Sequence, residues 1–352
     1  MEKKRYLYID ILNCMAIFAV LVQHTAQIAH QGNPNEQITI IGNILQTIFL
    51  PAVGIFFMNS GAMLLDYRYR QSTKEFFKKR FLRVVVPFLI WSVFYYWYSY
   101  HYYAFPGIFH RNVFSLRDFV QSFVDDKINS LFWFFFSIIQ LYLATPVFAV
   151  LAKKYKDILA YVVVVGVACG IVVPYIAALK GVNLSSGNIN VPLLNSSWIT
   201  YYVMGYLIKE DYLSDKIQMT IIALGTLNLG IDILNNIFVN KIVYFNNLGT
   251  MFYTFGLYIL IKRLTNHARS EGVTKFFAVL SSASLGIYVL HPLFIQLFDW
   301  YLFHVTPKVW DSYFEVLQNP IHIYVYPFVL YLVMAPIVLL IKKFKLMKYI
   351  LP

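Results

Sequence analysis

The stretch IDILNCMAIFAVLVQH, residues 9–24, is an apolar helix-forming segment that carries three polar side chains, Asp10, Asn13 and His24. A charged side chain at the centre of a membrane span costs about 2.5–3.5 kcal/mol on insertion scales, so a simple anchor would not retain such groups. At about 100° per residue, the step from Asn13 to His24 closes about three turns, and Asp10 lies about 40° from His24. We therefore expect a polar stripe that faces a protein interior or a water-filled cavity, and we place the functional site along it.

The composition of the chain is typical of a polytopic membrane protein. Of its 352 residues, 59% are hydrophobic and 13% are charged, whereas soluble domains contain about 25% charged residues. The net charge of +12 does not indicate a nucleic-acid partner, because the basic residues cluster between apolar segments, as orientation signals do. Cys14 and Cys169 lie in apolar segments without metal-ligand spacing, so we expect neither a disulfide nor a metal site.

Apolar windows of about 20 residues predict about ten membrane-spanning helices. They lie near residues 7–30, 39–65, 84–103, 131–150, 158–178, 197–208, 217–235, 246–261, 277–300 and 321–341. If the chain starts in the cytoplasm, most of the 29 Lys and Arg residues fall in cytoplasmic segments, as the positive-inside rule requires. We therefore predict an all-α polytopic protein with a single domain over residues 1–352, about ten transmembrane helices in one bundle and both termini cytoplasmic. The first span imitates a signal peptide, but no clean cleavage site follows it, so we expect it to be retained.

His24 is the first candidate for chemistry. It lies about 25 Å along its helix from Leu7, towards the outer side of the membrane core. A neutral imidazole at that depth is suited to act as a general base that takes the proton of a hydroxyl as it attacks an acyl carbon. The alternative is a histidine that packs in the bundle and bonds to a neighbouring helix. Asp10 and Asn13 are candidates to orient a catalytic group or to bind substrate, with interhelical hydrogen bonding as the alternative.

A polar break in the second span is a candidate donor contact near the cytoplasmic side. IFFMNSGAMLL, residues 55–65, contains Asn59, Ser60 and Gly61. Asn59 and Ser60 offer an amide and a hydroxyl, and Gly61 permits a turn or a close helix contact. No G-x-S-x-G elbow surrounds Ser60, so substrate contact or packing is favoured over a role as nucleophile.

A basic stretch before the third span is the second donor candidate. KKRFLRVVVPFLIW, residues 78–91, contains Lys79, Arg80 and Arg83. Arginine binds phosphate through two parallel hydrogen bonds, so this stretch is a candidate site for a polyanionic cytosolic ligand. Arg80 and Arg83 are expected to share a helical face. The alternative is an orientation signal that contacts anionic lipid.

Two later apolar stretches carry candidate substrate contacts. In SLGIYVLHPLF, residues 284–294, Tyr288 and His291 are three residues apart and share a helical face. A histidine and a proline at membrane depth are typical of a cavity wall, although a buried structural histidine is the alternative. LFWFFFSIIQLYLATPVF, residues 131–148, adds weaker aromatic candidates, Trp133 and Tyr142.

In their order and spacing, five of these stretches resemble the bacterial integral-membrane acyltransferase family 3. They are the first span up to His24, FFMNSGAMLL, KKRFLRVVVPFLIW, WFFFSIIQLYL and SLGIYVLHPLF. Members of that family acylate sugars of cell-surface polysaccharides and antibiotics. The resemblance implies that His24 is catalytic and that the basic loop with Arg80 and Arg83 faces an acyl-CoA donor. Asn13 stands where the family usually has arginine, and the chain stops before any fused SGNH-type hydrolase domain.

The resemblance and the residues together predict an O-acyltransferase of the bacterial plasma membrane. We expect it to move an acyl group, probably acetyl, from cytosolic acyl-CoA to a hydroxyl of a cell-surface glycan or lipid-linked sugar. Acetyl-CoA would be a co-substrate, and no cofactor would be bound permanently. The alternative is a transporter that exports a polysaccharide or lipid-linked sugar along the same polar stripe. Against the alternative, no internal repeat is recognisable in the sequence.

Overall fold

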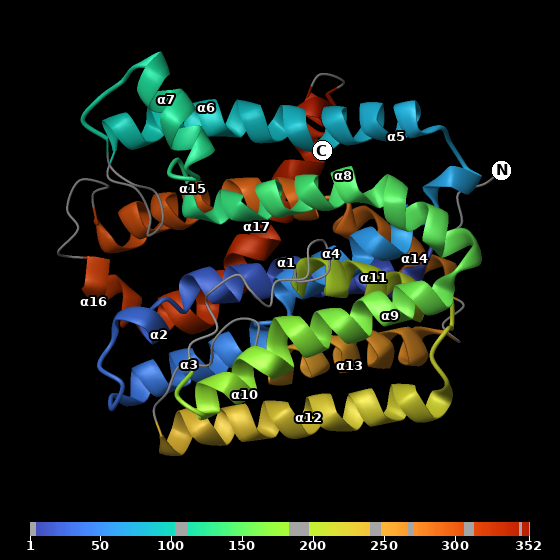
Figure 1. The fold of residues 1–352 in the computed structure, drawn as a ribbon. Coiled ribbons are helices and arrows are strands. Elements are labelled where there is room, and N and C mark those ends of the chain that lie inside the picture. The colour runs from blue at the N-terminus through green and yellow to red at the C-terminus, as the bar shows by residue number, and fades with distance from the viewer. Residues whose placement is uncertain are drawn as a thin grey trace.

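The protein is a bundle of helices. The computed structural model describes residues 5–102, 111–182, 197–239, 248–266, 270–305, 313–344 and 347–351. Within these ranges every regular element is a helix, and most helices lie along a common direction, with α5 and α6 at one edge of the bundle and α12 at the opposite edge (Figure 1). The all-α prediction is confirmed.

The elements follow one another in the chain with short connections. The first half contains α1 (Leu7–Thr25), α2 (Ile28–Gln31), α3 (Gln37–Phe49), α4 (Ala52–Leu64), η1 (Tyr67–Tyr69), α5 (Thr73–Arg80), η2 (Phe81–Val85), α6 (Val86–His101), α7 (Leu116–Val124), η3 (Ser130–Phe132), α8 (Trp133–Lys154), α9 (Lys156–Val167), η4 (Ala168–Val172) and α10 (Val173–Leu179). The second half contains α11 (Ser197–Lys209), α12 (Asp215–Phe238), α13 (Leu248–Thr265), α14 (Glu271–Ser281), α15 (Ser284–Phe303), α16 (Tyr313–Leu317), η6 (Ile321–Val325), α17 (Tyr326–Ile341) and η7 (Met347–Tyr349).

Among the described residues, 7 helical runs are long and apolar enough to cross a membrane. They are Leu7–Gln31, Gln37–Tyr69, Thr73–His101, Ser130–Lys154, Asp215–Phe238, Ser284–Phe303 and Ile321–Ile341. Three further predicted spans coincide with the continuous run from α9 to α10, with α11 and with α13, which are not among the seven. About ten crossings and the cytoplasmic side of each terminus therefore remain predictions.

Three of the helical segments, η2, η4 and η6, are π-helical turns. Each ends two residues before a proline, namely Pro87, Pro174 and Pro327. Proline lacks the N–H that continues an α-helix, and its ring crowds the carbonyl four residues earlier. A wider turn absorbs this conflict and changes the direction of the side chains around it. Because η2 directly follows Arg80, this change of helical pitch decides which basic side chains of the loop face the interior.

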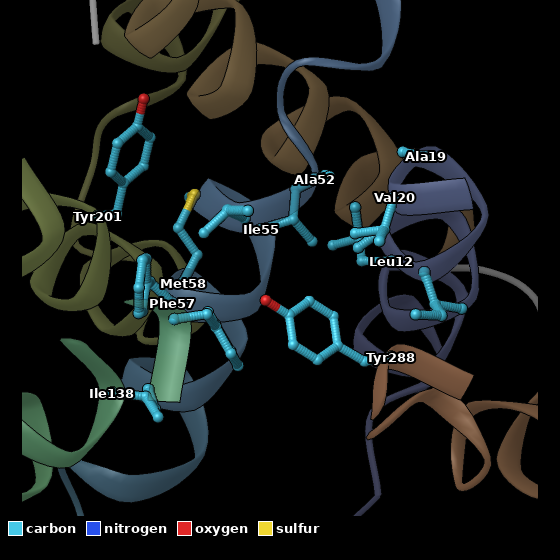
Figure 2. Close-up of a cluster of buried hydrophobic side chains, with 14 of the residues drawn as sticks. Leu12, Ala19, Val20, Ala52, Ile55, Phe57, Met58, Ile138, Tyr201 and Tyr288 are labelled. Atoms are coloured by element: carbon cyan, nitrogen blue, oxygen red, sulfur yellow. The ribbon is translucent and has the colours of Figure 1, made fainter. Parts of the chain in front are cut away.

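The closest helix contact joins α4 to α11. A Cβ atom on Gly61 would overlap the carbonyl oxygen of Tyr202, and a Cβ atom on Gly205 would overlap that of Met58. The two backbones therefore touch directly, as small residues permit between membrane helices. Around this contact lies the apolar core, whose side chains come from α1, α4, α8, α11 and α15 (Figure 2).

Ion pairs close one end of the bundle, which we call the basic end; it carries α5, α14 and the last turns of α8 and α11 (Figure 1). The Lys209 ammonium at the end of α11 is 2.7 Å from Asp66 Oδ2, which follows α4. Lys156 at the start of α9 is 2.8 Å from Glu210 Oε2. The charges that the positive-inside rule assigns to the cytoplasm thus also tie neighbouring helices together.

Replacing Gly205 with alanine tests the direct contact of α4 with α11. The added methyl group has to push the two backbones apart, and overpacking of this kind costs about 1–3 kcal/mol. We expect Gly205→Ala to lower the thermal midpoint of the detergent-solubilised protein. Gly230→Ala is the matched control, because a Cβ atom there meets nothing within 4 Å and alanine is favoured over glycine in a helix. Equal midpoints for the two variants would show that the contact is not needed for stability.

Candidate active site

A cavity of about 280 Å³ lies between α1, α4, α8 and α15, near the basic end. Its wall is mostly apolar, with polar groups from several helices. The polar and hydroxyl-bearing residues that line it are Asn13, Asn59, Ser60, Arg80, Tyr142, Ser281, Ser282, Ser284 and Tyr288. A concave apolar site with a few convergent polar groups is the usual form of a small-molecule site.

Asparagines from α1 and α4 form one side of the cavity. The Asn59 side-chain amide donates to Asn13 Oδ1 at 2.9 Å, and both residues line the cavity together with Ser60. Gly61 follows Ser60 but faces α11, where it makes the backbone contact with Tyr202. The predicted group Asn59, Ser60 and Gly61 is therefore divided, with two cavity residues and one packing residue.

Asp10 lies outside the cavity wall and joins helices at the basic end. Its carboxylate accepts hydrogen bonds from the Arg5 guanidinium at 2.7 and 3.1 Å, and from the Ser281 hydroxyl at 2.7 Å. Asp10 is 6% exposed, so these partners offset the cost of burying its charge. The structure thus gives Asp10 a contact between α1 and α14 and does not place it beside His24.

Arg80 is the only charged residue among the described residues that line the cavity. Its guanidinium carbon lies 5.7 Å from the centre of the Tyr142 ring, a cation–π distance. Arg83 is exposed and does not line the cavity, so the expected shared face of Arg80 and Arg83 is wrong. The π turn η2 separates the two residues and rotates Arg83 away. Lys79 is also outside the cavity, and its ammonium contacts Gln71 and Glu75.

His24 and His291 lie side by side, although they are far apart in the sequence. Their ring centroids are 4.9 Å apart and the rings are tilted by 32°. His24 is in the last turn of α1, about 16 Å beyond Asn13 at 1.5 Å per residue. The structure therefore brings together the two histidines that the sequence singled out on different spans.

Tyr288 connects the cavity to this histidine pair. It lines the cavity, and its ring centroid is 5.7 Å from that of His291. Figure 2 shows the ring projecting from α15 into the space between α1 and α4, and its hydroxyl donates to the carbonyl of Leu131 at 2.6 Å. The cavity and the histidine pair are thus neighbours along one axis of the bundle.

The other predicted aromatic contacts divide in the same way. Tyr142 lines the cavity beside Arg80. Trp133 does not line it, and its ring packs against Trp198 at a centroid distance of 5.1 Å. No group of three or more His, Cys, Asp and Glu side chains in the described ranges is placed to hold a metal ion.

A second buried polar cluster, which sequence reasoning missed, lies beyond the histidine pair. His322 Nδ1 is 2.8 Å from the carbonyl oxygen of Thr25, and His322 Nε2 is 3.4 Å from Asp299 Oδ1. The Tyr98 hydroxyl donates to Gln296 Oε1 at 2.6 Å. A sequence signal existed, because Asp299 is a carboxylate within an apolar span on the same helix as His291.

Asp126 precedes the helix that carries Trp133 and Tyr142, and it interacts electrostatically with Tyr288. It lies outside the membrane-spanning runs and has a left-handed backbone with φ of 55°. Partial burial raises the pKa of its carboxyl from 3.8 to about 6. Burial disfavours the charged form, so the folded protein holds this proton more tightly than the unfolded chain does.

This pKa shift predicts a pH-dependent gain from Asp126→Asn. Between the unfolded pKa and about 6 the folded state binds more protons, so its stability falls as pH rises through that window. The neutral amide removes this loss, and asparagine tolerates a positive φ. We expect the variant to melt at a higher temperature than the wild type at about pH 7.5, with the difference vanishing near pH 4. A difference that is the same at both pH values would mean that the charge of Asp126 is not its cause.

With this geometry described, comparison with known proteins gives one family. A family model described as an acyltransferase domain matches residues 6–342. No curated protein and no solved structure matches the chain. The matched range contains the whole cavity and both members of the histidine pair.

Proposed function

The chain belongs to the acyltransferase 3 family, and on this premise we propose that it moves an acyl group from acyl-CoA to a hydroxyl of a cell-surface or exported glycan. The acyl group we expect is acetyl, and the location we expect is the bacterial plasma membrane. The observation that carries the proposal is a cavity with one cationic group, Arg80, at the basic end and the His24–His291 pair beyond Tyr288.

The donor side of the site is the basic end. Arginine binds phosphate oxygens through charge-assisted hydrogen bonds, and Arg80 is placed to hold a phosphate of acyl-CoA. The volume of about 280 Å³ is near the lower limit for small-molecule sites, so it suits the narrow pantetheine arm better than a whole nucleotide. Asn13, Asn59 and Ser60 offer the hydrogen-bonding groups that this amide-containing arm needs.

The acceptor side is the histidine pair. In direct transfer the acceptor oxygen forms a bond to the acyl carbon, the carbon–sulfur bond breaks, and the thiolate leaves. The hydroxyl proton passes to the histidine pair and from there to the thiolate, so the pair acts first as base and then as acid. The glycan would approach from the end of the bundle opposite the basic end, and the surrounding partners are membrane lipids.

Transfer of labelled acetyl groups tests the proposal. Purified protein in liposomes, given radiolabelled acetyl-CoA and a cell-wall glycan mixture, is expected to label the glycan. His24→Ala should lower the rate about 10²- to 10⁴-fold, the range of general acid–base catalysis. His30→Ala is the matched control, because His30 is an exposed histidine outside the pair.

The outcomes separate the enzyme from the transporter. Unimpaired labelling by His24→Ala would remove His24 from the reaction. Movement of an unmodified glycan across the liposome membrane, without binding of acetyl-CoA by the wild type, would replace the acyltransferase with the transporter.

A kinetic comparison tests the donor site separately. We expect Arg80→Ala to raise KM for acetyl-CoA about 10- to 100-fold, because a hydrogen bond to a charged group contributes about 1.5–3 kcal/mol. Lys74→Ala removes an exposed basic residue of the same loop and should leave KM within about twofold, as exposed charges contribute little. Equal increases in both variants would indicate a general effect of loop charge and would remove the specific role of Arg80.

A further inference from the structure

We propose that His291 is the group that accepts the hydroxyl proton, and that Pro292 holds it in the tautomer that this role requires. The inference rests on the proposed acyl transfer and divides the work between the two histidines. It follows from the hydrogen bonds around one turn of α15.

The first observation is a missing backbone hydrogen bond. Pro292 lies inside α15 and has no N–H, so it cannot donate to the carbonyl of Tyr288 four residues earlier. In the structure His291 Nδ1 occupies that place, 2.6 Å from the Tyr288 oxygen. A carbonyl only accepts hydrogen bonds, so Nδ1 carries the proton.

The second observation concerns the other nitrogen of the same ring. A neutral imidazole has one donor and one acceptor nitrogen, so His291 Nε2 bears the lone pair. His291 is fully buried, and its Nε2 has no hydrogen-bond partner among the described residues. Histidine ligands and bases are commonly oriented by the bond that their other nitrogen makes. The Tyr288 carbonyl does this for His291 and leaves Nε2 ready to take a proton.

His24 is arranged in the opposite sense. Its Nδ1 is 3.5 Å from the amide nitrogen of Gln27, which also donates to the carbonyl of Gln23 at 3.2 Å. An amide nitrogen is always a donor, so this contact favours a lone pair on Nδ1 and a proton on Nε2 of His24. His24 would then donate a hydrogen bond where negative charge develops on the acyl oxygen.

The proton balance of the step is closed. The acceptor O–H bond breaks as the oxygen attacks the acyl carbon, and His291 Nε2 gains the proton. The carbon–sulfur bond then breaks, and His291 returns this proton to the CoA thiolate, which leaves as the thiol. The imidazole ends the cycle neutral, with its proton on Nδ1 against the Tyr288 carbonyl.

Nitrogen NMR of the histidine rings tests the tautomer without any measurement of activity. In ¹⁵N-histidine-labelled protein in lipid, the His291 signals are assigned as those absent from His291→Gln. We expect the Nδ1–H form in the wild type. In Pro292→Ala the new backbone N–H competes for the Tyr288 carbonyl, and we expect a mixture of tautomers. Pro336→Ala, which removes an exposed proline inside α17, should leave the His291 signals unchanged.

Kinetics supply the second readout. We expect His291→Gln to lower kcat about 10²- to 10⁴-fold and Pro292→Ala to lower it about tenfold, because only part of the protein then holds the right tautomer. KM for acetyl-CoA should stay within about twofold, since the donor site around Arg80 is unchanged. Pro336→Ala should retain the wild-type kcat, which excludes a general effect of removing a helix proline.

Two results would overturn the inference. One is a wild-type His291 with its proton on Nε2, and the other is a His291→Gln variant with kcat within about twofold of the wild type. Failure of the proposed function looks different: the wild type would transfer no acyl group and bind no acyl-CoA, whatever the tautomer of His291. The wild-type spectrum and His291→Gln decide the inference even if Pro292→Ala does not fold.

Discussion

The direct backbone contact of α4 with α11 sets the geometry on which the rest of the site depends. With glycine at positions 61 and 205 the two helices touch without side chains between them. Once Gly61 faces α11, the helical turn directs Asn59 and Ser60 to the other side, towards α1, where they line the cavity. Asn59 then reaches Asn13, and this bond aligns the helix that carries His24. A packing constraint between two backbones thus fixes the polar wall of the cavity.

The remaining polar groups show a second constraint, that buried donors and acceptors need partners where water is excluded. Asp10 is neutralised by Arg5 and Ser281, and His322 binds the carbonyl that ends α1. Prolines take part in the same accounting, because each removes one backbone donor. At Pro292 a histidine side chain replaces the missing donor, so a local defect in a helix becomes a means of orienting a functional group.

The sequence predicted the helical class, most of the apolar segments and the family, because these depend on composition and local order. It also named His24, His291, Arg80 and Tyr288, which the structure gathers around one axis. It misplaced Arg83, since the face of a helix is read by assuming regular pitch and η2 breaks that pitch. It could not find the ties of Asp10 to Ser281 or of His322 to Thr25, because both join residues more than 250 positions apart. Such pairs depend on tertiary packing, which local patterns do not encode.

The central claim is that the cavity beside Arg80 receives the acyl-CoA donor and leads it to the histidine pair. The most direct measurement is a structure of the protein in lipid nanodiscs with a non-hydrolysable thioether analogue of acetyl-CoA. The account predicts density for the pantetheine arm between Asn59 and Tyr288, with a phosphate at Arg80 and the acyl end directed towards His24 and His291. Density for the analogue at another surface, with this cavity unchanged at saturating ligand, would contradict the account.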